Sequence, residues 1–242
     1  MTTHPQPADT RTRRGPLRAL RAVPASRHHL WLMLTLTFAT GIIDAVGFLG
    51  LDRVFTGNMT GNVVILGMGL TGADDLPVLG PTLALIGFIV GAATAGRILA
   101  TASTGWTRRT TILFTLTAFT EIAAGITLLT DVDPGGRSVQ LIITTLVGAG
   151  MGVQAAAARH IAVKDVTTVV VTSTLTGLAA DTLSGTGNGS HAGRRVAAIL
   201  LILVGAGVGA ALLQWHLSAG FIAAGLLTAA TACIGAVHVR QN

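Results

Sequence analysis

Six long apolar segments recur along the chain, and they limit what it can fold into more than any other feature. They cover residues 30–50, 78–100, 111–130, 138–158, 195–214 and 217–238. Each is close to the roughly 20 residues that an α-helix needs to cross about 30 Å of hydrocarbon. Inside a bilayer the backbone N–H and C=O groups have no water to bind, and a helix pairs them with each other within the segment. The pattern therefore predicts an all-α integral membrane protein with about six transmembrane helices.

The scarcity of charge supports this prediction. Only 11% of the 242 residues are charged, against about 25% in an average soluble domain. Half of the residues are hydrophobic, and the mean hydropathy is +0.68. A chain with so few charges cannot cover a water-soluble surface, which excludes a typical cytosolic enzyme, a disordered protein and a coiled coil. Cys233 is the single cysteine, so no intramolecular disulfide can form.

The excess of positive charge lies in the N-terminal tail. Residues 1–29 contain six arginines and one aspartate, a balance of +5 out of the chain's net charge of +6. Such a tail before a first span indicates a cytoplasmic segment beside anionic lipid, in preference to an arm that binds nucleic acid. Four prolines in the same stretch favour disorder. We therefore expect a disordered basic cytoplasmic tail over 1–29 and a single transmembrane domain over 30–240.

Two further segments differ from ordinary spans. Segment 56–72 has a polar first half and a short apolar part, and segment 166–183 contains six threonines and one serine. Both are predicted to be broken or re-entrant elements, which enter the membrane without crossing it. If neither crosses, nearly all Lys and Arg residues share one side with both termini and the 101–110 loop, and that side is cytoplasmic. If both cross, the chain has eight spans and 97–109 is an external loop.

The order of these segments occurs twice. A long span, a broken segment and two long spans follow one another in 30–130 and again in 138–238. With three crossings in each half, the second half is inverted relative to the first, which is a plan found in secondary transporters. The alternative to an inverted repeat is a chance likeness between helices rich in Gly and Thr.

Two acidic residues lie inside predicted spans. Asp44 falls in 30–50, and Glu121, the only glutamate of the chain, falls in 111–130. Insertion scales put an aspartate at the centre of a transmembrane helix at roughly 2.5–3.5 kcal/mol, so both side chains should face the protein interior or a water-filled cavity. Each is either a proton or cation site or a carboxyl group that joins helices through hydrogen bonds.

Segment 55–62 is the most distinctive local feature. Gly57 and Gly61 allow close approach of the backbone, and Asn58, Thr60 and Asn62 add polar side chains. Asn58 and Asn62 would share a face of a helix. A half-helix that begins here would point unpaired N–H groups and its positive end into the membrane, which suits an anionic or polar ligand. The alternative is a small-residue face on which helices pack.

Gln154 and Thr174 are the polar candidates of the second half. Gln154 is the strongly polar side chain that lies deep within its span, and Thr174 lies in the threonine-rich segment. We expect 56–62 and 171–177 to approach each other inside the membrane, because lipid contact would be costly for both. Asp44 should contact the segment from Asn58 to Asn62, since a chain that turns back after residue 50 can return to the depth of Asp44.

Pairs of glycines four residues apart occur in three spans. These pairs indicate close helix packing, either within the bundle or between the subunits of a homo-oligomer; they are Gly87 and Gly91, Gly148 and Gly152, and Gly205 and Gly209. Catalytic motifs such as HExxH, GxSxG and the Walker loop are missing from the sequence. We therefore expect no enzyme activity, no cofactor and no metal site.

The motifs of both halves resemble one known family. Residues 40–51 read TGIIDAVGFLGL and residues 54–62 read VFTGNMTGN, and they are similar to the G-x-x-D-A span and the V-F-x-x-N-M-T-G-N segment of the YoaK family. Residues 150–154 and 172–178 resemble the second motif pair of that family, although Ala155 stands where the family usually has Asn. The resemblance implies a bacterial inner-membrane protein of unknown function, and it implies no substrate.

The sequence as a whole favours a small secondary transporter or permease for a small polar solute. The residues expected to bind the solute, or a proton, are Asp44, Asn58, Thr60, Asn62, Glu121, Gln154 and Thr174. The alternative is a non-transporting membrane scaffold or subunit that binds a partner through its Gly-rich helix faces. The expected partners are the lipid bilayer, the solute or proton and a second copy of the chain, and nucleic acid is not among them.

Overall fold

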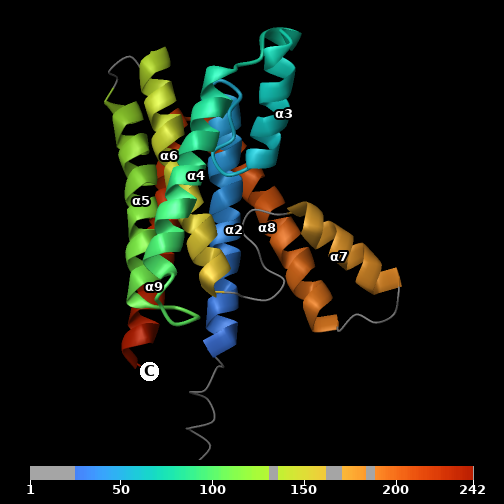
Figure 1. Ribbon diagram of the computed structural model, residues 1–242, viewed down its shortest axis with the longest axis vertical. Coiled ribbons are helices and arrows are strands. Elements are labelled where there is room, and N and C mark those ends of the chain that lie inside the picture. The colour runs from blue at the N-terminus through green and yellow to red at the C-terminus, as the bar shows by residue number, and fades with distance from the viewer. Residues whose placement is uncertain (1–24, 131–135, 162–170, 184–188, 242) are drawn as a thin grey trace, which may run out of the picture.

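The computed structural model describes residues 25–130, 136–161, 171–183 and 189–241, and every regular element in these residues is a helix (Figure 1). The long helices are α2 (Ala25–Gly50), α4 (Leu79–Leu99), α5 (Arg108–Leu129), α6 (Arg137–Ile161), α8 (Gly189–Leu213) and α9 (Leu217–Gln241). Shorter elements are α3 (Met59–Leu70), the 3₁₀ turn η1 (Ala73–Asp75) and α7 (Val171–Leu183). The chain is thus an all-α membrane protein.

The six long helices coincide with the six predicted spans. Among the described residues, these six are long and apolar enough to cross a bilayer. Five of them extend beyond their apolar segments at one end or both, because polar residues continue a helix into the interface where hydropathy no longer marks it, whereas α4 lies within 78–100. The first helix begins at Ala25, so the last five residues of the expected tail are helical. The rest of that tail, residues 1–24, lies outside the described residues.

The long helices pack in three close pairs, α4 with α6, α2 with α8 and α5 with α9. Glycines allow this closeness. A Cβ atom at Gly91 of α4 would collide with the carbonyl oxygen of Ala149 on α6, and one at Gly205 of α8 would collide with that of Phe38 on α2. Small residues are the usual means of close helix packing in membranes. The glycine pairs predicted from the sequence therefore serve helix contacts within one chain.

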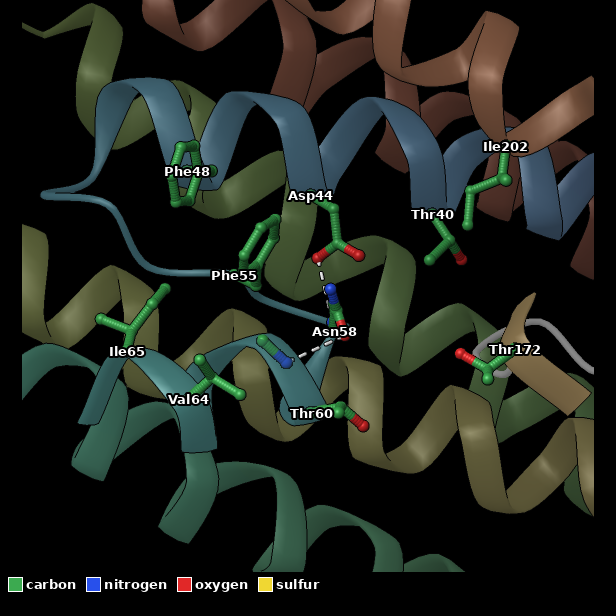
Figure 2. Close-up of a pocket in the computed structure, with 11 residues that line it drawn as sticks. Thr40, Asp44, Phe48, Phe55, Asn58, Thr60, Val64, Ile65, Thr172 and Ile202 are labelled. Atoms are coloured by element: carbon green, nitrogen blue, oxygen red, sulfur yellow. Dashed lines mark hydrogen bonds between the residues drawn. The ribbon is translucent and has the colours of Figure 1, made fainter. Parts of the chain in front are cut away.

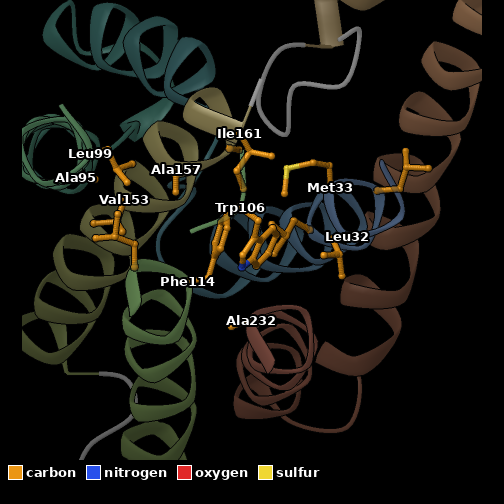
Figure 3. Close-up of a cluster of buried hydrophobic side chains, with 14 of the residues drawn as sticks. Leu32, Met33, Ala95, Leu99, Trp106, Phe114, Val153, Ala157, Ile161 and Ala232 are labelled. Carbon is orange, nitrogen blue, oxygen red and sulfur yellow. The ribbon is translucent and has the colours of Figure 1, made fainter. Parts of the chain in front are cut away.

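One hydrophobic cluster fills the end of the bundle where α2 begins (Figure 3). Trp106 lies at its centre, with its ring centroid 5.2 Å from that of Phe114. The indole N–H donates to the Thr111 hydroxyl over 2.9 Å, so the buried ring keeps a hydrogen bond. At the same end, Arg109 donates to the carbonyl oxygen of Ile98 over 2.8 Å and thereby caps the last turn of α4.

Segment 51–75 enters the bundle and leaves it on the same side. The chain turns after α2 at Asp52 and Arg53, which both have positive φ, and returns to the level of Asp44 before α3 begins. The 12 residues of α3 rise only about 18 Å, too little to cross a bilayer. Arg53 and Asp74 hold the two turns together with an N–O distance of 3.3 Å. The first broken segment is therefore re-entrant.

The second broken segment is described only from residue 171 onward. Its helix α7 packs against α8 (Figure 1), and its Gly177 lies against the Arg195 guanidinium. Residues 166–170 lie outside the described residues. With six long helices, α2 begins and α9 ends at the same end of the bundle, where the α4–α5 loop also lies (Figure 1). The cytoplasmic identity of that end stays a prediction.

Candidate functional site

The centre of the site is the carboxyl group of Asp44, six residues before the end of α2 at Gly50. Its Oδ1 atom accepts backbone hydrogen bonds from Thr56, Gly57 and Asn58, over 3.1, 2.6 and 3.2 Å. The Thr56 hydroxyl lies 3.4 Å from the same oxygen. These N–H groups stand at the start of α3, where a helix leaves its donors unpaired and carries a partial positive charge. The predicted contact between Asp44 and this segment is confirmed.

These hydrogen bonds change the interpretation of the N-terminus of α3. The sequence suggested that the unpaired N–H groups would receive an anionic or polar ligand. In the structure they donate to the chain's own carboxylate, so the position of an anion is already filled. The Oδ2 atom of Asp44 accepts no hydrogen bond from the described residues and opens onto a pocket. The group available to a ligand is therefore an acceptor, not a set of donors.

Gly57 makes the short distance to Asp44 achievable. A Cβ atom at this position would lie 2.9 Å from the Met151 methyl group of α6 and 3.4 Å from Asp44 Oδ1. Any larger side chain would push the segment away from α2 or α6. The glycine is thus required by close approach between backbone and side chains, as its place in the motif indicated.

The two asparagines of the motif have different roles. Asn62 is buried and bridges the backbone of Phe55: its Oδ1 accepts from Phe55 N over 2.9 Å and its Nδ2 donates to Phe55 O over 2.6 Å. Asn58 is the N-cap of α3, and its Oδ1 accepts from Gly61 N over 3.2 Å. Asn62 therefore fixes the fold of the re-entrant turn, whereas the side-chain Nδ2 of Asn58, a lining residue of the pocket described below, makes no hydrogen bond with the described residues.

The pocket beside Asp44 has a volume of about 560 Å³ and lies between α2, α3, α8 and the start of α7 (Figure 2). One part of its wall is polar and another is aromatic and aliphatic. The lining residues are Thr40, Asp44, Phe48, Phe55, Asn58, Thr60, Gly61, Val64, Ile65, Thr172 and Ile202. Thr60 of α3 and Thr172 of α7 thus line the same pocket, although the two helices do not pack against each other.

Three of the seven predicted site residues line the pocket: Asp44, Asn58 and Thr60. Asn62 and Gln154 lie behind its wall. Gln154 is buried on α6 and donates from Nε2 to the Thr40 hydroxyl over 3.0 Å, so it supports a residue of the wall.

The other two predicted residues lie elsewhere among the described residues. Thr174 is buried on α7 and does not line the pocket, whereas Thr172, two residues earlier, does. Glu121 is buried on α5 beside the Thr228 hydroxyl of α9. No residue of α5 is among the described residues that line the pocket. The Oε2 atom of Glu121 and the Oε1 atom of Gln154 are buried and have no hydrogen-bond partner among the described residues.

Eight of the eleven lining residues were not predicted to bind the solute, among them Thr40 and Phe48 on α2, Phe55 before α3 and Ile202 on α8. A signal for two of them was present. Thr40, Asp44 and Phe48 follow one another at intervals of four residues, which places them on one face of a helix. Phe55 stacks on Phe48 with centroids 4.7 Å apart, a contact between separate segments that spacing does not reveal.

No cluster of three metal-ligating side chains occurs in the described part of the chain.

Comparison with known proteins supports the resemblance of the motifs. Residues 32–234 match the sequence model of a family described as "Protein of unknown function (DUF1275)". The UPF0700 transmembrane protein YoaK of Bacillus subtilis (strain 168) is 35% identical over 159 residues, which are 65% of this chain and 68% of that protein. No solved structure matches the chain.

Proposed function

The chain belongs to the DUF1275 family of proteins of unknown function, and we propose that it is a small secondary transporter that carries a polar solute through the Asp44 pocket. We place it in a bacterial inner membrane with both termini in the cytoplasm, following the Arg distribution. One observation carries the proposal: a carboxyl oxygen at the depth of a membrane span faces an open pocket without a partner among the described residues. Intramembrane carboxyl groups of this kind mark solute and ion pathways.

The surroundings of Asp44 distinguish a transporter from a scaffold. A scaffold needs only the Oδ1 hydrogen bonds, which hold α3 against α2. The cavity of about 560 Å³ has no purpose in a scaffold, and a large pocket lined by few polar groups is typical of a ligand site. The three glycine pairs are used between helices of the same chain, so these pairs are not available to a partner.

The helix contacts support an inverted repeat of α2–α5 and α6–α9. In such a repeat α2, α3, α4 and α5 correspond to α6, α7, α8 and α9. Each contact of one half then has a counterpart in the other: α4–α6 corresponds to α8–α2, α5–α6 to α9–α2 and α3–α4 to α7–α8. All six of these pairs are in contact. Glycines at matching places make the contacts: Gly87 and Gly91 of α4 meet α6, and Gly205 and Gly209 of α8 meet α2. Inverted repeats with broken helices at matching places are a common plan of secondary transporters.

The two halves differ at the pocket. Gly41 of α2 matches Gly148 of α6, since each packs against the same turn of its partner helix. Three residues later, Asp44 matches Met151, whose methyl group lies against Gly57. The acid therefore exists in one half only, and it belongs to a single solute site near the centre of the repeat.

Movement of the re-entrant elements would open this site to either side. In the inverted arrangement, α3 reaches the pocket from one end of the bundle and α7 reaches it from the other (Figure 1). Both line the same pocket through Thr60 and Thr172. Displacement of α3 would expose Asp44 to one side of the membrane and displacement of α7 to the other, which is alternating access around a fixed site.

Glu121 is the candidate for a coupling proton. The Thr228 hydroxyl beside it has one hydrogen, which it donates either to Glu121 or to the carbonyl oxygen of Ala224 over 3.0 Å; when Ala224 receives it, the hydroxyl can only accept from Glu121. A protonated carboxyl group supplies the missing donor and an ionised one does not. Loss and gain of that proton would change the α5–α9 contact, which runs through the centre of the repeat.

Uptake into proteoliposomes tests the proposal. The purified chain is reconstituted and a panel of small labelled metabolites is offered from outside, with and without an imposed pH gradient. We expect uptake of one solute class by the wild type, loss of uptake in Asp44→Asn and full uptake in Asp75→Asn. Asp75 is a matched control, because it is exposed and its positive φ is one that Asn tolerates. Equal uptake by Asp44→Asn and the wild type would remove Asp44 from the pathway.

A further inference from the structure

We propose that the solute is a small organic cation, a protonated or quaternary amine, and that Oδ2 of Asp44 is its counter-ion. The inference rests on the proposed function, because it names the substrate class of the same site. Three properties of the pocket lead to it: its charge, the hydrogen bonds that orient Asp44 and the aromatic and aliphatic part of its wall.

The charge of the pocket excludes an anionic solute. Among the described residues that line it, Asp44 is the only ionisable side chain. An anion would meet the Asp44 carboxylate without any Lys, Arg or His in that lining to offset it. The positive end of α3, which attracts anions elsewhere, is already occupied by Asp44 Oδ1. A cation meets the opposite situation, since it finds one carboxylate and no competing cation.

The hydrogen bonds of Asp44 leave one oxygen in a fixed position. Three backbone N–H groups donate to Oδ1, and backbone N–H groups can only donate. They hold the plane of the carboxyl group, so that Oδ2 faces the cavity (Figure 2). An ammonium group that donates to Oδ2 would form a charge-assisted hydrogen bond, which is about twice as strong as a neutral one.

The size and the apolar wall select an organic cation over an inorganic ion. A cavity of about 560 Å³ falls within the range of small-molecule sites, roughly 300–1,000 Å³. Phe48 and Phe55 stack beside Asp44 with their rings inclined by 22°, and Val64, Ile65 and Ile202 continue the apolar surface. An inorganic ion needs oxygen ligands on several sides, whereas an amine with a short carbon chain fits a carboxylate on one side and aromatic rings on the other.

Binding of matched probes to the purified full-length chain tests this inference without a transport step. Isothermal titration in detergent compares n-butylammonium, choline and tetramethylammonium with n-butanol and butyrate at constant chloride concentration. We expect at least one of the three cations to bind and butyrate to show no binding. Asp44→Asn should weaken cation binding at least tenfold, and Asp75→Asn should leave it unchanged. Absence of binding by all three cations, or tighter binding of butyrate, would overturn the inference.

A second variant keeps the test decisive if Asp44→Asn does not fold. Val64→Trp leaves Asp44 and its hydrogen bonds in place and fills part of the cavity, so it should also weaken cation binding at least tenfold. Unchanged cation binding in Val64→Trp would place the cation outside this pocket and overturn the inference. Cation binding without uptake into proteoliposomes would refute transport and leave the cation site standing. Uptake of an anion without cation binding would refute the cation and leave transport standing.

Discussion

Replacement of Asp44 by Ala should destabilise the protein far more than replacement by Asn. Three backbone N–H groups, at 2.6, 3.1 and 3.2 Å from Oδ1, lose their acceptor in Asp44→Ala. A buried donor without a partner costs about 1–3 kcal/mol. Asp44 is only half-buried and water can enter the pocket, so the lower limit applies to each donor. The expected loss of unfolding free energy is therefore about 3 kcal/mol in total.

Asp44→Asn keeps an acceptor oxygen in the same place. It exchanges charge-assisted hydrogen bonds for neutral ones, which should cost about 1 kcal/mol. The contrast between the two variants isolates the structural role of Oδ1 from the role of the charge. If Asp44 contributes to function only as a charge, Asp44→Asn should fold almost normally and lose transport.

Unfolding in mixed detergent micelles measures this difference. The free energy of unfolding is followed by circular dichroism as the mole fraction of sodium dodecyl sulfate increases, for the wild type, Asp44→Asn and Asp44→Ala. Asp75→Asn is the control, since Asp75 is exposed, Asn tolerates its positive φ and surface changes usually stay within about 0.5 kcal/mol. If Asp44→Ala is as stable as Asp75→Asn, the carboxylate does not close the N-terminus of α3 and the account of the re-entrant turn is wrong.

Three further predictions concern packing, coupling and topology. Gly91→Ala should destabilise the protein by about 1–3 kcal/mol, because the new Cβ collides with α6. Gly96→Ala is the control: no atom lies within 4 Å of its new Cβ, and it should stabilise the protein by up to about 1 kcal/mol. Equal melting temperatures of the two variants would contradict the close α4–α6 pair. Glu121→Gln should fold but lose the response of solute uptake to an imposed pH gradient, and an unchanged response would exclude Glu121 as the coupling site. Thr104→Cys, made in a Cys233→Ala background, should resist an impermeant maleimide added outside intact cells, and labelling from outside would reverse the proposed orientation.

The sequence predicts the spans well because their physical cause is local. A run of about 20 apolar residues has few alternatives to a transmembrane helix, and all six predicted runs are helical. The ends are less well predicted, since Ala25 and Gly189 begin helices among polar residues that hydropathy does not recognise. The re-entrant element was also predictable, because Gly, Asn and Thr at the depth of Asp44 have no place in contact with lipid.

The roles of the polar residues depended on geometry that spacing does not contain. Asn58 and Asn62 were expected on one helix face, but Asn58 is an N-cap with φ −82° and ψ 79°, outside the regular helix. Their side chains consequently point to different partners. The sequence also indicated the depth of Asp44 without its partners, so it could not show that the carboxylate fills the α3 N-terminus. Glu121 was grouped with the site only by its depth, and the fold places it on the α5–α9 contact.

Accessibility of the pocket from the two sides of the membrane tests the central claim most directly, because it requires no knowledge of the solute. Thr60 lines the pocket and is exposed, so Thr60→Cys in a Cys233→Ala background reports on access to Asp44. A membrane-impermeant thiol reagent is applied to right-side-out and to inside-out vesicles. A permeation pathway with alternating access predicts labelling from both sides, and slower labelling when an organic cation is present. Labelling from one side only, at a rate that no solute changes, would contradict transport through this pocket.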